Sequence, residues 1–189
     1  MSIVVRKKCS ISILGLLAVL VLTIIPANAI EAPSFKDCTA KDSCYAAAVY
    51  VSQHDIYNGV DGNFVPAQEM TYMDISVMLV NAHSGKQEGV NATLFYLLKA
   101  KQSGYLNDVE DPFAKVTVSD AVQTIFKAQK NEKFFKDTDG KDTALTIAKK
   151  AGIIKTEDDG KAICTREIAA KAIMLAAVNS TVKERNHGK

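Results

Sequence analysis

The sequence predicts a mainly α-helical domain made of three helix-loop-helix repeats. Two observations carry this prediction. Thr71, Thr117 and Thr165 lie 46 and 48 residues apart, and each opens an amphipathic helical pattern. A further helical stretch precedes each threonine and stops at a turn. The composition agrees with a globular domain, because 48% of the 189 residues are hydrophobic and 23% are charged.

The first 29 residues are typical of a secretory signal peptide. A basic stretch with Arg6, Lys7 and Lys8 precedes an apolar run from residue 11 to residue 25, which is shorter than the roughly 20 residues of a membrane-spanning helix. The segment from Pro26 to Ala29 supplies the small residues that signal peptidase accepts. An uncleaved anchor is the alternative. Cleavage would leave a single domain over 30–182 and a polar, frayed tail over 183–189.

The charge of that domain excludes two classes of partner. Three basic residues and no acidic residue lie in the first 29 positions, so 20 basic and 21 acidic side chains remain. A near-neutral domain has no general electrostatic attraction to nucleic acid or to anionic lipid. We therefore expect no nucleic-acid partner, and no membrane association after signal cleavage.

The first helix of each repeat is predicted at 45–54, 92–103 and 143–151. The residues that follow are Asp55, Gly104 and Gly152, and glycine adopts the left-handed conformation that ends a helix. Asp tolerates this conformation better than most residues. The three repeats then cover about 35–83, 84–130 and 131–178.

The second helix of each repeat begins at its threonine. Thr71 with Asp74, and Thr117 with Asp120, have the spacing of capping boxes. Apolar residues recur four, eight and eleven positions after each threonine, which places them on one helical face. We expect the middle set of this face to share the central core: Leu79, Ile125 and Ile173.

Cysteine usage fits an exported domain. Five residues separate Cys38 from Cys44, and we predict a local disulfide between them after export. Cys164 occupies the apolar position directly before its threonine, equivalent to Met70 and Val116, so we predict a buried, unpaired thiol. The histidines are scattered along the chain, so we predict no structural zinc site.

Several short motifs of the repeats resemble the S-layer homology family. They are Phe35-Lys36-Asp37, Gly62-Asn63-Phe64-Val65-Pro66, Gly104-Tyr105, Pro112-Phe113, Phe135-Lys136-Asp137, Gly152-Ile153 and Thr165-Arg166-Glu167. The resemblance implies a pseudo-threefold bundle that anchors a protein without catalysis. It also implies grooves between the repeats that bind an anionic, often pyruvylated, cell-wall polysaccharide. The ligand-binding residues it implies here are Arg166, Asp37, Asp137, Thr165, Glu167 and Gly152.

The chain departs from this family at two threonine motifs. Tyr72 and Val118 stand where the other two arginines would be, so at most one groove keeps the usual cation. We expect Arg166 to carry the charge recognition, above helix N–H groups that are unpaired and favour an anion. The alternative is that Arg166 only pairs with a surface carboxylate.

Catalytic and metal-binding motifs are not apparent. The segment from Asp137 to Asp142 partly matches the pattern of an EF-hand calcium loop. However, Asp142 stands at the position that needs Gly, and Ala148 stands at the position that needs an acidic residue. We therefore predict no enzyme activity, no cofactor and no metal site. Two functional classes remain for a protein secreted to the bacterial cell surface or cell wall. One binds anionic cell-wall polysaccharide, and the other keeps the fold but binds an envelope protein.

Overall fold

The structure is a computed structural model that describes residues 33–86, 92–106, 109–129, 141–158 and 160–187. The described residues belong to one compact unit, Ala32–Lys189. The predicted signal peptide, Asp137 and most of the candidate calcium loop lie outside them. Within the described part the chain is mainly helical, with six helices, no strand and only isolated β-bridges.

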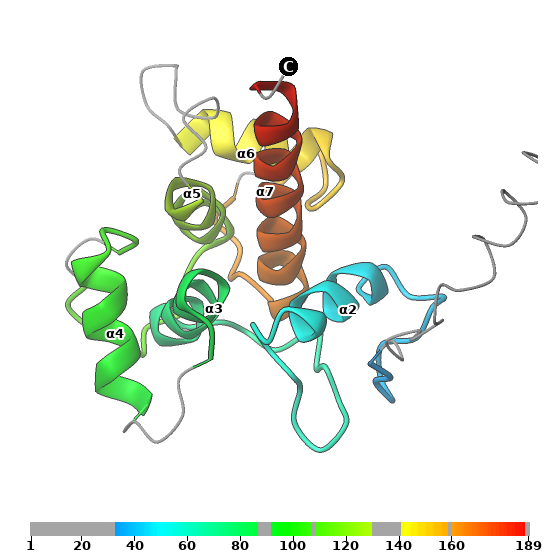
Figure 1. Cartoon of the computed structure of the whole chain (residues 1–189), viewed down its shortest axis with the longest axis horizontal. Coiled ribbons are helices and arrows are strands. Elements are labelled where there is room, and N and C mark those ends of the chain that lie inside the picture. The colour runs from blue at the N-terminus through cyan, green and yellow to red at the C-terminus, as the bar shows by residue number, and fades with distance from the viewer. Residues whose placement is uncertain (1–32, 87–91, 107–108, 130–140, 159, 188–189) are drawn as a thin grey trace, which may run out of the picture. The chain divides into compact units, whose positions relative to one another are not determined.

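The helices follow the predicted order closely (Figure 1). Their bounds are α2 Tyr45–Gln53, α3 Tyr72–Ser84, α4 Ala92–Gln102, α5 Val118–Ala128, α6 Lys141–Lys150 and α7 Arg166–His187. The three first helices are α2, α4 and α6, and the three second helices are α3, α5 and α7. α7 continues to His187 and so includes part of the predicted polar tail over 183–189.

Two predicted caps explain where the second helices begin. The Thr71 hydroxyl accepts from the Asp74 amide at 3.2 Å, and the Asp74 carboxylate accepts from the Thr71 amide at 2.8 Å. This is the complete capping box expected before α3. Before α5, the Thr117 hydroxyl likewise accepts from the Asp120 amide. Local side chains therefore fix these two helix starts.

The three first helices end in the same kind of turn. Asp55, Gly104 and Gly152 have φ values of 54°, 71° and 68°, as the sequence predicted. The amide after each of them donates to a carbonyl five positions earlier, which is the bonding of a Schellman motif. These bonds run from Ile56 to Val51 at 2.8 Å, from Tyr105 to Ala100 at 2.9 Å and from Ile153 to Ala148 at 2.9 Å.

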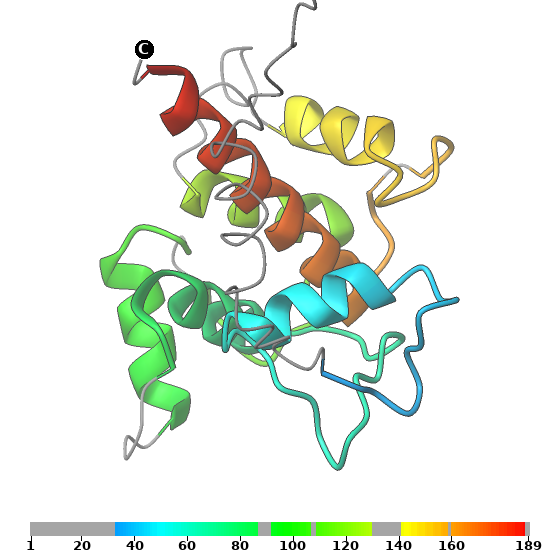
Figure 2. The same cartoon turned by 45° about the vertical axis from the view of Figure 1, so that its right-hand side comes forward.

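Each first helix packs against the second helix of another predicted repeat. The contacting pairs are α2 with α7, α4 with α3 and α6 with α5. In addition, α5 contacts both α3 and α7 (Figures 1 and 2). The first and last described helices are thereby neighbours, although more than one hundred residues separate them in the chain.

A closed ring of three backbone hydrogen bonds joins the segments that precede the threonines. The Met70 amide donates to the Cys164 carbonyl at 2.9 Å, the Cys164 amide donates to Val116 at 2.8 Å, and the Val116 amide donates to Met70 at 3.1 Å. All three side chains are buried. Three stretches of chain from different predicted repeats therefore meet at one place.

The core predictions are confirmed. Leu79, Ile125 and Ile173 are fully buried and belong to one apolar cluster. Cys38 and Cys44 form a disulfide. Within the described residues Cys164 is free and buried, and burial raises the pKa of its thiol to about 12.

Candidate functional site

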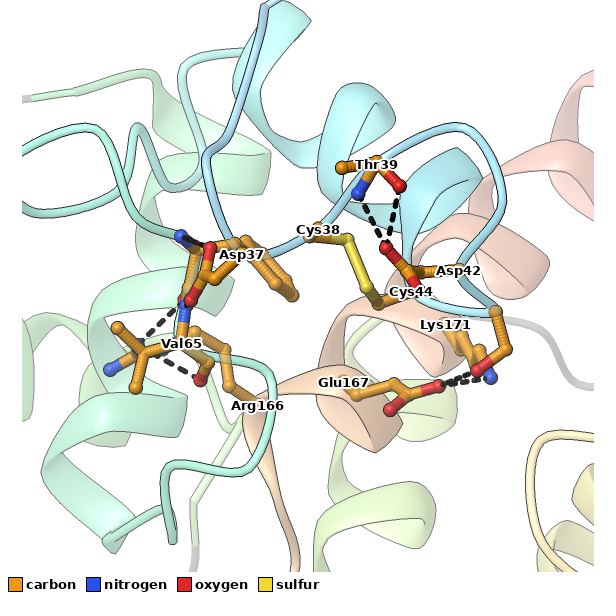
Figure 3. Close-up of a disulfide and its surroundings, with 11 residues drawn as sticks. Asp37, Cys38, Thr39, Asp42, Cys44, Val65, Arg166, Glu167 and Lys171 are labelled. Atoms are coloured by element: carbon orange, nitrogen blue, oxygen red, sulfur yellow. Dashed lines mark hydrogen bonds and ion pairs between the residues drawn. A yellow bond between two sulfur atoms is a disulfide. The ribbon is translucent and has the colours of Figure 1, made fainter.

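The structure separates the predicted site residues into two places. Asp37 and Arg166 converge on one loop (Figure 3). Gly152 lines a pocket, and Glu167 binds two side chains of that pocket, Ser43 and Lys171. Thr165 precedes α7 and forms an isolated β-bridge with Glu69. Asp137 lies outside the described residues.

Arg166 and Asp37 bind opposite sides of the same peptide segment (Figure 3). One guanidinium nitrogen, Nη1 of Arg166, donates to the Phe64 carbonyl at 2.8 Å and to the Val65 carbonyl at 3.3 Å. The Asp37 carboxylate accepts from the Phe64 amide at 2.7 Å and from the Val65 amide at 2.8 Å. The guanidinium carbon also lies 4.4 Å from the centre of the Tyr57 ring. We call Asp37, Arg166 and Tyr57 the loop clamp.

The clamp holds an unfavourable backbone conformation. Val65 has a φ of 55°, which a β-branched residue rarely adopts. Such strain persists only where the surrounding structure supports it. Here the amide and the carbonyl of Val65 are both bound by charged side chains. Arg166 and Asp37 therefore act together to hold this loop.

This arrangement corrects two expectations about Arg166. Its bonds go to main-chain carbonyls, not to a surface carboxylate. The start of α7 also presents no free amide at its first two residues, because the Arg166 amide donates to Gln68 at 2.9 Å and the Glu167 amide donates to Pro66 at 3.0 Å. The expected anion site above unpaired N–H groups is wrong at these two amides.

At α3 and α5, as at α7, the first two helix amides donate to carbonyls of a distant loop. The first two amides of α3 donate to the carbonyls of Ala114 and Pro112. The first two amides of α5 donate to Ala162 and Gly160. Each helix start is thus capped by the loop of a different predicted repeat. These partners are too far away in sequence for a local motif to reveal them.

A pocket of about 170 Å³ lies where α2, α7 and the end of α6 meet. Its walls are mainly small or apolar, and its polar side chains are Ser43 and Lys171. Gly152, for which the resemblance implies ligand binding, is one of its lining residues. The full set of lining residues is Ser43, Ala46, Ala47, Ala151, Gly152, Ile153, Lys171, Met174 and Leu175.

Glu167 connects the two polar side chains of the pocket. Its Oε1 atom accepts from the Ser43 hydroxyl at 2.6 Å and from the Lys171 ammonium at 2.5 Å (Figure 3). Burial acts to raise the pKa of Glu167, but the hydrogen bonds from Lys171 and Ser43 outweigh it, and the pKa is lowered overall. An ammonium has three N–H donors, so this ion pair leaves Lys171 with donors for a further anion.

Sequence reasoning missed Lys171 and Ser43. Lys171 lies four residues after Glu167, and an i, i+4 acid–base pair in a helix was a usable signal. For Ser43 no such signal existed, because 124 positions separate it from Glu167. The disulfide between Cys38 and Cys44 encloses Ser43 and ties its loop to the start of α2.

Across the described ranges, no helix is long and apolar enough to cross a membrane. Those same ranges contain no group of His, Cys, Asp and Glu side chains that could hold a metal ion. No protein-family model matches the chain, and no curated protein matches it in sequence.

Proposed function

We propose that this protein is a secreted, non-enzymatic module of the bacterial cell envelope, built from three S-layer-homology-like repeats in a pseudo-threefold bundle. The ring of Met70, Val116 and Cys164 supports the repeat arrangement, because equivalent residues make equivalent bonds. The three helix pairings support it too, since each joins a first helix to the second helix of another repeat. The three matching helix ends agree with the same arrangement.

The proposed ligand is an anionic cell-wall polysaccharide, bound at the pocket beside Gly152. The observation that carries this proposal is the combination of small walls with the Lys171 ammonium. Alanine and glycine walls leave room for a substituent of a sugar ring, and the ammonium pairs with its negative charge. Because Arg166 holds the loop clamp, the charge recognition belongs to Lys171 in this proposal.

The test is sedimentation of the mature protein with purified cell-wall fragments, with and without removal of the wall polysaccharide. We expect wild-type protein to sediment only with fragments that keep the polysaccharide. Lys171→Met should lower the bound fraction at least tenfold, because the anion loses its charged partner. Lys127→Met, on the exposed side of α5, is the matched control and should bind as wild type does. Wild-type protein that never sediments, at any ionic strength, would overturn the glycan proposal.

The second candidate function is binding of an envelope protein. The exposed side chains of Leu94, Leu98 and Phe113 favour it, since exposed large apolar groups mark interaction surfaces. Retention of an envelope protein, but no polysaccharide, on the immobilised domain would favour this candidate.

A further inference from the structure

The charged wall of the Gly152 pocket belongs to a chain of contacts that starts at the disulfide. Within the described part of the chain, Lys171 is the only charged residue that lines this pocket. Its ammonium donates to Oε1 of Glu167, and the Ser43 hydroxyl donates to the same oxygen at 2.6 Å. The side chains of Lys171 and Glu167 are only 18% and 27% exposed. The two donors therefore meet at an oxygen that is partly shielded from water, where hydrogen bonds are electrostatically stronger.

The position of Ser43 is set by the disulfide loop, which we define as residues 38–44. Ser43 is itself exposed, so its neighbours in the chain, not burial, fix its place. Cys38 and Cys44 are 0% and 3% exposed and belong to the main apolar cluster. The Asp42 carboxylate accepts from the Thr39 amide at 2.7 Å and from the Thr39 hydroxyl at 2.8 Å (Figure 3). The loop is thus anchored in the core, and α2, which begins directly after it, packs on α7.

The Ser43 hydroxyl affects how the pocket receives an anion. The Glu167 carboxylate repels any anion that approaches Lys171, because both carry negative charge. A hydroxyl that donates to Oε1 offsets part of the carboxylate charge and holds the carboxylate in one orientation. The ammonium bound to the same oxygen is then held in the pocket wall, with its remaining N–H donors available to a ligand. Loss of the Ser43 bond would free the carboxylate to turn and would strengthen its repulsion.

We propose that Ser43, Glu167 and the Cys38–Cys44 disulfide position the Lys171 ammonium for anion binding. The disulfide holds Ser43 on Glu167, and Glu167 holds the ammonium in the pocket wall. This inference rests on the proposed function of the pocket and adds a requirement to it. The pocket has its full affinity for an anion only when the two cysteines are joined.

The first test measures Glu167 directly and needs no polysaccharide. Carbon-13 NMR of the mature protein follows the Glu167 side-chain carboxyl through a pH titration. Ser43→Ala should raise the Glu167 pKa toward its ordinary value of 4.5, because the carboxylate loses a donor. Ser43→Thr keeps a hydroxyl and should restore the wild-type pKa. Thr39→Val is the matched control, since it removes a hydroxyl that bonds only within the disulfide loop, and it should leave the Glu167 pKa unchanged.

The disulfide is tested by the same titration. Cys38→Ala with Cys44→Ala should raise the Glu167 pKa as Ser43→Ala does, and all three changes together should raise it no further, because the disulfide acts through Ser43. Circular dichroism shows whether each variant keeps its helices. A variant that unfolds is titrated in sucrose, which favours the folded state.

Three results of these titrations would overturn the proposal. The first is a wild-type pKa for Glu167 in Ser43→Ala or in the disulfide-free protein. The second is a pair of effects that simply add, since the disulfide would then act independently of Ser43. The third is a disulfide-free protein that stays unfolded in sucrose, which would assign the disulfide to the fold as a whole.

Sedimentation with purified wall fragments provides the second readout. We expect Ser43→Ala and the disulfide-free protein each to lower the bound fraction by about threefold, since the ammonium is less well positioned. Ser43→Thr and Thr39→Val should bind as wild type does. If wild-type protein sediments and Ser43→Ala binds equally well, the positioning proposal fails and the polysaccharide proposal stands. If wild-type protein never sediments, the polysaccharide proposal fails, and the NMR titrations still decide whether the disulfide acts on Glu167 through Ser43.

Discussion

Arg166 shows how one side chain can serve the fold at the place where a ligand contact was expected. Its guanidinium binds two carbonyls of a loop that lies about one hundred positions earlier, and it covers the Tyr57 ring. Asp37 binds the amides of the same segment. Two charged side chains thus satisfy the polar groups of a turn in which Val65 has a positive φ. The loop clamp makes a loop of the first predicted repeat dependent on Arg166 of the third predicted repeat.

Arg166→Ala should therefore lower the free energy of unfolding. Two main-chain carbonyls lose a charged donor, and hydrogen bonds to charged groups contribute about 1.5–3 kcal/mol each. We expect a loss of about 2 kcal/mol in urea denaturation at neutral pH. Lys127→Ala, an exposed change in α5, should alter stability by less than about 0.5 kcal/mol. Equal stability of the Arg166 variant and wild type would show that the clamp contributes nothing.

Glu167 should make stability dependent on acid. Its pKa in the folded protein is lowered from the ordinary value of 4.5, because the bonds from Lys171 and Ser43 outweigh burial. The stabilisation is therefore complete above pH 4.5 and is lost as pH falls through the lower folded pKa. When the pH is lowered from 7 to 3, the urea concentration at the unfolding midpoint should fall more for wild type than for Glu167→Gln. An identical fall in both proteins would remove Glu167 as a cause.

For the helices, local sequence signals were sufficient to predict where each helix begins and ends. They were insufficient to predict which distant residues bind the helix ends. Threonine caps and the residues at 55, 104 and 152 predicted where helices start and stop, because each signal acts within a few residues. The sequence also predicted the Cys38–Cys44 disulfide and the burial of Cys164. The bonds of Arg166 and of Ser43 were not, since each crosses more than one hundred positions. Of the residues that line the candidate pocket, the resemblance named only Gly152, and it also named Glu167, which binds the lining side chains Ser43 and Lys171.

The central helix face offers a direct test of the repeat alignment. Ile125 in α5 is fully buried in the cluster that contains Leu79 and Ile173. Ile125→Ala should cost about 2–5 kcal/mol, because it removes buried methyl groups and leaves a cavity. For a domain of this size the melting temperature should fall by roughly 5–15 °C. Lys127→Ala, half a turn away, should leave the melting temperature nearly unchanged. If Ile125→Ala also left the melting temperature unchanged, Ile125 would lie outside the core.

In the whole described unit, the first and the last segments of the chain contact each other. The first described helix, α2, packs on the last, α7, and the start of α7 is capped by the Pro66 and Gln68 carbonyls of the first repeat. The Met70 amide likewise depends on the Cys164 carbonyl. The first two amides of α3, α5 and α7 each bond to carbonyls of another predicted repeat, so one predicted repeat cut from the chain would leave these amides and carbonyls without partners.

This closure determines when the chain can finish folding. During synthesis from the N-terminus, α2 and the loop at Phe64 are made about one hundred residues before Arg166 and α7. Contacts between such distant segments form late, because the intervening chain must be ordered first. The disulfide between Cys38 and Cys44 joins residues only six positions apart, so its formation does not require the later part of the chain. A nascent chain therefore has an unfinished first predicted repeat until α7 is made, and a ribosome that stalls before residue 166 leaves a chain that cannot form these contacts.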